Sequence, residues 1–291
     1  MLGRRAFLAS AGGGLVLASR VLAATRALPE FTFQVVTDTH IGRQDSNTPL
    51  KQWQQAAREI SATPGEFVLH LGDVVDGARE AQYPIYMEAR KAITRPVYEV
   101  PGNHDPQELF AKHIRPQVDM SFEHGGVRFV LFNNSDPDSH LGFIKPPQVE
   151  WLRGEFAAAA KADQFVVAVC HVPVHTNLSP DRGWYVKPAD GQTDFYAALE
   201  EHKSRVIGVF HGHFHNGIRG WNDHRPFVEV CFPSCCYNQD RGLVNHPKLT
   251  GFVVDELRAG YTNVTLGRGK LTLTYKPLGI ESTGQHEHTF G

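Results

Sequence analysis

The segment FTFQVVTDTH, residues 31–40, is an apolar run that ends abruptly in polar side chains, and this pattern recurs along the chain. GEFVLHLGDVVD at 65–76 and RPVYEVPGNHD at 95–105 repeat it. The apolar runs at 31–37, 66–71 and 96–100 predict buried strands, and the segments at 50–60 and 83–93 between them predict helices. This β-α-β-α-β succession is typical of a layered α/β domain.

The rest of the chain continues the alternation and then changes character. Further strands are expected at 127–133, 165–170 and 205–210, with helices at 147–161 and 194–202. The segments 226–232, 251–256, 261–266 and 271–276 predict consecutive strands of a second, more antiparallel sheet. We therefore expect one domain over residues 28–280, with no internal repeat. Residues 281–291 are polar and predict a frayed tail, in which His286 and His288 are tail residues rather than ligands.

Residues 1–27 have the composition of an export signal. Arg4 and Arg5 precede Phe7, and a Gly- and Ala-rich apolar run leads to small residues near position 27. The segment resembles a twin-arginine (Tat) signal, and Arg20 near the end of the run also favours Tat over Sec export. A Sec signal and an N-terminal anchor are the alternatives, but the run is short and broken by glycines 12–14. We expect a periplasmic or otherwise exported protein, without stable membrane insertion once the signal is removed.

Composition limits the partners of the protein. A hydrophobic fraction of 41% with 21% charged residues is ordinary for a soluble globular chain. The formal net charge of -2 predicts no basic face for nucleic acid. The oligomeric state is left open. The four cysteines, in a compartment that favours oxidation, are compatible with a disulfide or with buried thiols: Cys170, Cys231, Cys235 and Cys236.

Five short segments concentrate Asp, His, Asn and Gly where apolar strands stop, at 38–40, 72–76, 102–105, 170–173 and 212–215. Residues at the carboxyl ends of strands in an open α/β sheet converge on one crevice. Side chains two positions apart on an extended segment point the same way, as for His213 and His215. Carboxylate, imidazole and amide ligands without thiolate favour Mn, Fe or Zn. Seven such groups suit two ions that share a carboxylate, the arrangement that stabilises an in-line phosphoryl displacement.

The order Asp-x-His, Gly-Asp-x-x-Asp, Gly-Asn-His-Asp, His and Gly-His-x-His resembles the calcineurin-like metallophosphoesterase superfamily. Within it, the chain is most similar to the bacterial group that contains class III cyclic-nucleotide and glycerophosphodiester phosphodiesterases. The resemblance implies a four-layer α-β-β-α sandwich of two mixed sheets flanked by helices. It also implies a hydrolase that cleaves a small phosphate ester, with a phosphodiester favoured; export is expected from residues 1–27.

The same resemblance assigns roles to the polar residues. One metal ion would bind Asp38, His40, Asp73 and His215, and the second would bind Asp73, Asn103, His171 and His213. A hydroxide that bridges the two ions would attack phosphorus. His104 would stabilise the charge of the transition state and also protonate the leaving oxygen as general acid, with Asp105 orienting it and Asp76 supporting a ligand histidine.

Substrate contacts are expected at Asn103 and His104. His175 is either a surface residue or a further substrate contact. The loops at 136–145, 174–190 and 234–246 would choose between diester and monoester, and their Trp184, Tyr185 and Tyr237 either stack on a base or pack within the protein. The alternatives are a phosphomonoesterase of the same fold, a nuclease, and a non-catalytic periplasmic protein that binds metal or phosphate.

Overall fold

The computed structural model describes residues 28–290, apart from residues 138, 176–182, 216–217, 219–226 and 239–253. The segment predicted to be a signal peptide, residues 1–27, lies outside the described residues. No helix in the described ranges is long and apolar enough to cross a membrane. All four cysteines are buried thiols, which decides between the two states left open by the sequence.

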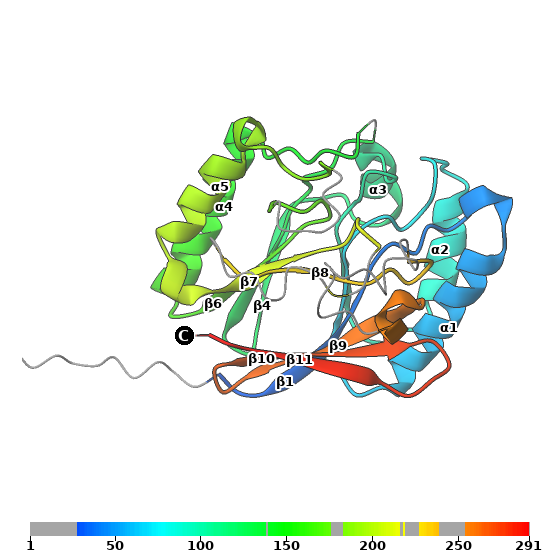
Figure 1. Cartoon of the computed structure of the whole chain (residues 1–291). Coiled ribbons are helices and arrows are strands. Elements are labelled where there is room, and N and C mark those ends of the chain that lie inside the picture. The colour runs from blue at the N-terminus through cyan, green and yellow to red at the C-terminus, as the bar shows by residue number, and fades with distance from the viewer. Residues whose placement is uncertain are drawn as a thin grey trace, which may run out of the picture.

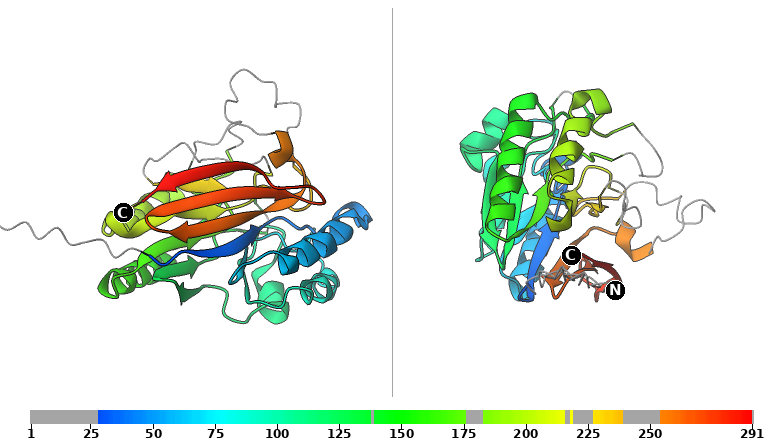
Figure 2. Two further views of the ribbon diagram at one scale, coloured as in Figure 1. Left: turned by 90° about the horizontal axis from the view of Figure 1, so that it is seen from below. Right: turned by 90° about the vertical axis from the view of Figure 1, so that its left-hand side faces the viewer.

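The first sheet has six strands in the order β11-β10-β9-β1-β2-β3. The strands β1 (Phe31–Val36), β2 (Val68–His70) and β3 (Val97–Glu99) are parallel. An antiparallel group made of β9 (Gly260–Gly267), β10 (Lys270–Pro277) and β11 (Thr283–Thr289) continues the sheet beyond β1. Figure 2 shows these C-terminal strands, orange to red, beside the blue β1. The first sheet is therefore mixed.

The second sheet has five strands in the order β4-β5-β6-β7-β8. The hairpin β4 (Met120–His124) and β5 (Val127–Leu131) is antiparallel. The strands that follow are parallel to β5, and they are β6 (Phe165–Val169), β7 (Val206–His211) and β8 (Glu229–Cys231). This sheet is also mixed.

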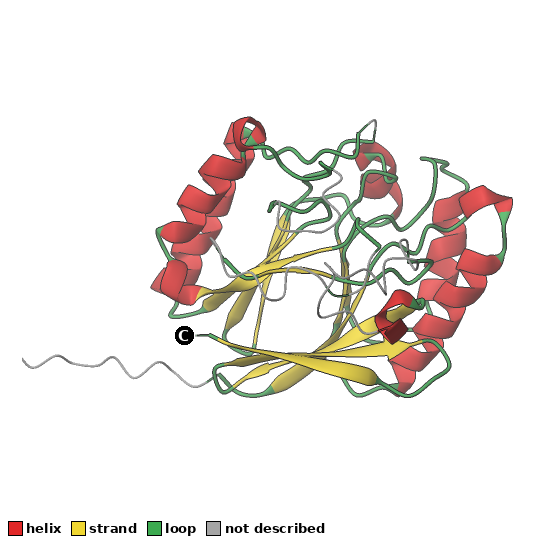
Figure 3. Ribbon diagram, in the orientation of Figure 1, coloured by secondary structure: helices red, strands yellow, loops and turns green. Residues whose placement is uncertain are grey.

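Helices cover the outer face of each sheet (Figures 1 and 3). One apolar cluster packs α1 (Thr48–Ala62) and α2 (Gln82–Arg90) on the first sheet, and another packs α4 (Pro146–Lys161) and α5 (Gln192–Glu200) on the second. A third cluster, rich in phenylalanine, fills the space between the sheets. The predicted four-layer sandwich is confirmed. Within the described ranges, the remaining helices are α3 (Gln107–His113) and short 3-10 turns at Arg43–Asp45, Pro188–Asp190, Lys203–Arg205 and Val254–Leu257.

Two predictions for the C-terminal part were wrong. The strands expected after residue 226 do not form a sheet of their own, because β8 pairs in parallel with β7 while β9 and β10 extend the first sheet beside β1. The described part of the strand expected at 251–256 is instead the 3-10 helix Val254–Leu257. Pattern alone shows that a segment is extended, but the partner strand is decided by which sheet edge it can cover.

A third prediction, the frayed tail expected at 281–291, is also wrong, because Thr283–Thr289 form edge strand β11. The ring of Phe290 is buried against Phe165, with ring centroids 5.2 Å apart. Side chains of an edge strand can remain polar because one face of it stays in contact with water. His286 pairs with Glu256 at 2.6 Å, so the prediction that it is not a metal ligand agrees with its contacts.

Candidate metal centre

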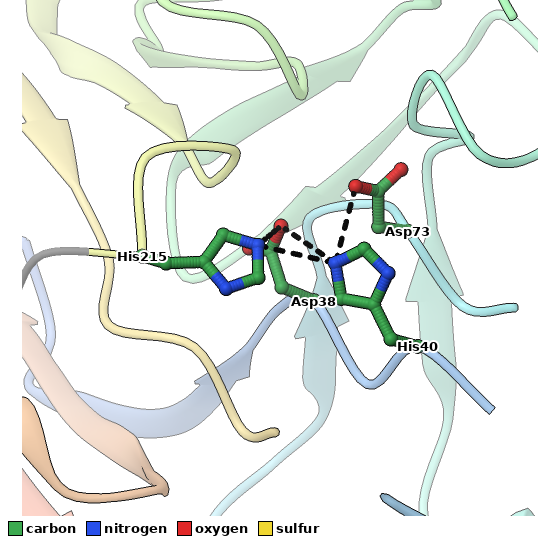
Figure 4. Close-up of side chains that lie close together, drawn as sticks. All are labelled: Asp38, His40, Asp73 and His215. Atoms are coloured by element: carbon green, nitrogen blue, oxygen red, sulfur yellow. Dashed lines mark hydrogen bonds and ion pairs between the residues drawn. The ribbon is translucent and has the colours of Figure 1, made fainter. Parts of the chain in front are cut away.

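Seven polar side chains gather where β1, β2 and β3 of the first sheet and β6 and β7 of the second sheet end. They are the seven ligands predicted from the sequence, each at most 6% exposed: Asp38, His40, Asp73, Asn103, His171, His213 and His215. Both sheets present the carboxyl ends of parallel strands at the same edge, which brings the loops together. Figure 4 shows four of these side chains converging on one point.

The first group consists of Asp38, His40, Asp73 and His215. His215 Nε2 lies 2.9 Å from Asp38 Oδ1. His40 Nε2 lies 3.4 Å from Asp73 Oδ2 and 3.1 Å from His215 Nε2. Two carboxylates and two imidazole nitrogens therefore surround a space the size of one ion.

The second group consists of Asp73, His171 and His213. His171 Nε2 lies 3.3 Å from Asp73 Oδ2 and 3.3 Å from His213 Nδ1. Asn103 Oδ1 is buried and has no hydrogen-bond partner within the described part of the chain. A buried amide oxygen left without a partner is unfavourable, and a cation would satisfy it. Oδ2 of Asp73 faces both groups, so this carboxylate is the one that two ions would share.

In each ligand histidine, the inner ring nitrogen points into the ligand cluster and the outer one points away from it. The hydrogen bond of the outer nitrogen determines which of the two carries the hydrogen. His171 Nδ1 donates to Leu71 O at 2.7 Å, His213 Nε2 to His140 O at 3.1 Å, and His215 Nδ1 to Tyr237 O at 2.8 Å. Asp76 Oδ1 accepts from His40 Nδ1 at 3.0 Å. All four partners are acceptors, so the hydrogen sits on the outer nitrogen and the inner nitrogen is free to bind metal. The donor set thus fits two metal ions.

Charge also favours cations at this centre. Burial acts to raise the pKa of Asp73, but the neighbouring His171, His104 and His40 hold it well below its usual range. Burial lowers the pKa of His40 and His213, which keeps these rings in the neutral state that binds metal. Burial opposes protonation of His171 too, but Asp73 raises its pKa to about 9. Without a metal, a proton on His171 therefore balances the charge of Asp73.

The ligand loops are conformationally strained. Five of the seven residues have positive φ angles: Asp38 at 55°, His40 at 45°, Asp73 at 53°, His213 at 74° and His215 at 54°. Such angles are unfavourable outside glycine, and they persist where surrounding contacts impose them. The glycine before Asp73 has a φ of 100°, and a Cβ there would lie 2.5 Å from His171 Nδ1. Gly72 is therefore needed for the close approach of the two loops.

The predicted role of Asp105 needs correction. Its carboxylate is 1% exposed, and it accepts backbone hydrogen bonds from Val74 at 3.0 Å, Val75 at 3.1 Å and Gly102 at 2.9 Å. Asp105 therefore holds the backbone around Asp73 instead of orienting His104. The carboxylate near His104 is Asp76, whose Oδ1 is 3.6 Å from His104 Nδ1. The predicted support of a ligand histidine by Asp76 agrees with its 3.0 Å contact to His40.

His104 and Asn103 line a pocket of about 420 Å³ together with His140 and with Gly77, Ala78, Pro137 and Ser139. This pocket is where a substrate could reach the metal centre. His175 is not among the residues that line this pocket; its backbone N–H donates to Glu229 Oε1 at 2.9 Å, and its ring is 6.5 Å from the ring of Tyr196. Its substrate contact stays a prediction.

Sequence reasoning missed several groups at the site. The ring of His140 stacks on Trp184 at 4.3 Å, and its carbonyl oxygen accepts from the ligand His213. The guanidinium of Arg43 lies 3.9 Å from the centre of the Tyr237 ring, which is also 4.3 Å from the ring of His215. Trp184 and Tyr237 therefore pack against ligand histidines. No sequence signal marks carbonyl oxygens, because every residue has one.

Metal binding should be visible as a change in thermal stability. We expect Mn²⁺ or Zn²⁺ to raise the Tm of the wild-type protein, since a ligand at 100 times its Kd stabilises the folded state by about 2.7 kcal/mol. Asp73→Asn should abolish most of this shift, because its carboxylate faces both ligand groups. Differential scanning fluorimetry with metal and with EDTA measures it. Asp45→Asn, at an exposed carboxylate, is the control, and a wild-type Tm that no metal changes would contradict the site.

Comparison with known proteins agrees with this geometry. The family model described as calcineurin-like phosphoesterase matches residues 31–217. A probable cyclic nucleotide phosphodiesterase of Rhodococcus erythropolis is 28% identical over 160 residues, which are 48% of this chain and 51% of that protein. The chain thus aligns with about half the length of that relative.

A 3',5'-cyclic adenosine monophosphate phosphodiesterase of Haemophilus influenzae is 21% identical over 243 residues, covering 79% of this chain and 84% of that protein. The solved structure of a dimetal phosphatase from Danio rerio shares the fold, with a TM-score of 0.67 at 14% identity, over 90% of this chain and 99% of that one. The ligand motifs from Asp38 to His215 lie within the matched segment. The chain therefore belongs to the calcineurin-like phosphoesterase family, and the family predicted from its motifs is confirmed.

Proposed function

We propose that the protein is an exported phosphodiesterase that binds two metal ions and hydrolyses a small phosphate diester. The shared carboxylate of Asp73 carries the proposal, because its Oδ2 lies 3.4 Å from His40 Nε2 and 3.3 Å from His171 Nε2. Mn, Fe or Zn suit the carboxylate, imidazole and amide donors. When bound, two such ions lower the pKa of a water molecule toward neutrality and neutralise charge on the phosphoryl group.

The protein holds this donor set rigid before substrate arrives. Thr37 Oγ1 donates to Asp38 Oδ2 at 2.6 Å, and the backbone N–H of His213 donates to the same oxygen at 3.2 Å. The other oxygen of Asp38 shares the His213 N–H at 3.3 Å and faces His215 Nε2 at 2.9 Å. The backbone N–H of His104 likewise donates to Asp73 Oδ1 at 2.9 Å, which leaves Oδ2 for the two ligand groups. Such preorganisation avoids reorganising the site during the reaction.

The contacts of His104 bear on the two roles that the motif suggested. The backbone N–H of Gly77 donates to His104 Nδ1 at 3.2 Å, so Nδ1 is an acceptor and the ring hydrogen belongs on Nε2. A hydrogen on Nε2 can stabilise a phosphoryl oxygen that gains charge in the transition state. A general acid would need hydrogens on both ring nitrogens. The N–H of Gly77 faces Nδ1 as a donor, whereas Asp76 Oδ1, 3.6 Å from the same nitrogen, would accept a hydrogen there. The contact to Gly77 is the shorter, so we infer that transition-state stabilisation is the main role and leave proton donation to the test below.

The diester preference rests on the relatives and on the site. The two bacterial relatives are named for cyclic nucleotides, which are phosphodiesters. A pocket of about 420 Å³ beside Asn103 and His104 accommodates a small ester. The formal net charge of -2 gives no electrostatic support for a nucleic-acid substrate. A phosphomonoesterase of the same fold is the second candidate.

A direct assay separates these candidates. Residues 28–291, loaded with Mn, Fe or Zn, should release nitrophenol from bis(p-nitrophenyl) phosphate faster than from p-nitrophenyl phosphate, and should hydrolyse cyclic AMP. EDTA and Asp73→Asn should each abolish turnover. Faster cleavage of the monoester would make the protein a phosphomonoesterase. Two bound ions with no turnover of any of the three esters would instead indicate a binding protein.

The role of His104 predicts how its replacement depends on the leaving group. We expect His104→Asn to lower kcat about 100- to 1,000-fold, the usual loss when one donor to a charged oxygen is removed. The loss should be similar for nitrophenyl diester and cyclic AMP, with unchanged metal content. A far larger loss with cyclic AMP, whose leaving oxygen is more basic, would show that His104 donates a proton. His202→Asn is the control at a histidine outside the ligand loops.

Export is proposed from the sequence of residues 1–27. The adjacent Arg4 and Arg5 are the groups on which twin-arginine recognition would depend. Replacing both by lysine in the full chain should leave the protein in the cytoplasmic fraction, whereas the unmodified chain should appear in the periplasm. Export of the lysine variant at the normal level would favour a Sec signal. An unprocessed, membrane-bound protein would indicate an anchor.

A further inference from the structure

The loop that follows β6, residues 171–175, carries the ligand His171 across from the second sheet to the first. Its ring reaches the end of β2, where Nδ1 donates to Leu71 O at 2.7 Å. The carbonyl of His171 accepts from the backbone N–H of Gly212 at 3.1 Å, which joins this loop to the one that carries His213. The position of this short loop therefore determines where the His171 ring lies.

Asn134, three residues beyond Leu131 at the end of β5, binds the start of the loop. It is 1% exposed. Its Oδ1 accepts from the backbone N–H groups of His171 at 3.2 Å and Val172 at 3.0 Å, and its Nδ2 donates to Val172 O at 2.7 Å. Asn134 thus makes three of the four hydrogen bonds open to an asparagine side chain with one dipeptide, residues 171–172. These bonds fix the peptide plane from which the His171 side chain projects.

Glu229, in β8, accepts hydrogen bonds from the end of the same loop. It is 1% exposed, and Oε1 accepts from the backbone N–H groups of Val174 at 2.6 Å and His175 at 2.9 Å. Its Oε2 accepts from Tyr196 Oη at 3.0 Å. A buried carboxylate is unfavourable unless donors surround it, so these contacts hold the loop and the carboxylate in one arrangement.

We propose that Asn134 and Glu229 are positioning residues. They fix where the His171 side chain lies, and thereby determine how tightly the second ligand group binds its metal ion. The proposal rests on the two-ion function described above. The effect should be confined to one ion, because the ligands of the first group other than the shared Asp73 lie on other loops: Asp38, His40 and His215. Removing the hydrogen bonds of Asn134 or Glu229 should therefore weaken binding of the second ion and leave the first ion bound. A role in folding alone would lower overall stability without separating the two ions.

Manganese titration of residues 28–291 tests the claim. Isothermal calorimetry gives the two dissociation constants, and electron paramagnetic resonance distinguishes a spin-coupled pair of Mn²⁺ ions from a single ion. We expect Asn134→Ala to weaken the second ion about 10- to 100-fold, the usual effect of removing a residue that orients a ligand. The first ion should change less than about two-fold, and the spectrum at equal metal should become that of an isolated ion.

The neighbouring Asn133→Ala is the matched control. It removes an amide of the same size whose contacts are to Gln107 and Ser135 rather than to the ligand loop. Glu229→Gln, which keeps an oxygen acceptor for the loop, should weaken the second ion less than Glu229→Ala. If Asn134→Ala is insoluble, Asn134→Ser keeps a polar atom in the buried space, is too short to reach both N–H groups, and should give the same selective loss.

The outcomes distinguish this inference from the proposed function. A wild-type protein that binds fewer than two ions would overturn the two-ion function. A wild-type protein with two ions, together with an Asn134 variant that binds both with unchanged constants, would overturn only the positioning role. Equal weakening of both ions would overturn it as well, because the loss would then reflect general destabilisation.

Discussion

The buried carboxylate of Asp73 is the group on which the rest of the site depends. It is 2% exposed and lies between histidines that belong to different sheets, His40 on the first and His171 on the second. A negative charge in such a place is tolerated only when cations and donors compensate it. The backbone N–H of His104 donates a hydrogen bond to this carboxylate. Its charge is balanced by a proton on His171 in the metal-free protein, and would be balanced by the ions once they bind.

Holding that charge in place requires an unusually constrained backbone. Five of the seven predicted ligands have positive φ angles, which are unfavourable unless surrounding contacts impose them: Asp38, His40, Asp73, His213 and His215. The support comes from buried polar side chains that bind backbone groups. Asp105 binds three N–H groups around Asp73, and Asn134 and Glu229 bind the loop of His171. The site is therefore rigid because buried side chains outside the ligand set fix the ligand loops.

The mixed sheets explain why a two-ion centre can form between them. The parallel strands of both sheets have their carboxyl ends on the same side of the molecule, so each sheet contributes its own ligands. The antiparallel β9, β10 and β11 widen the first sheet beyond β1. The aromatic core between the sheets fixes their separation. That separation sets the distance over which Asp73 and His171 meet. We expect substrate choice to be made by the loops around the pocket, where the ring of His140 stacks on Trp184.

The sequence by itself determined the layered α/β fold, the family and the positions of the seven donors, because apolar strands and the polar residues that end them are local patterns. It could not determine which sheet β8 to β11 would join, since pairing depends on distant edges, and it misjudged the polar residues of β11. Only the tertiary structure showed that Asp105 binds backbone instead of His104, and that His175 lies beside Glu229. These contacts join residues far apart in the chain, and backbone acceptors such as Leu71 O leave no mark in the sequence.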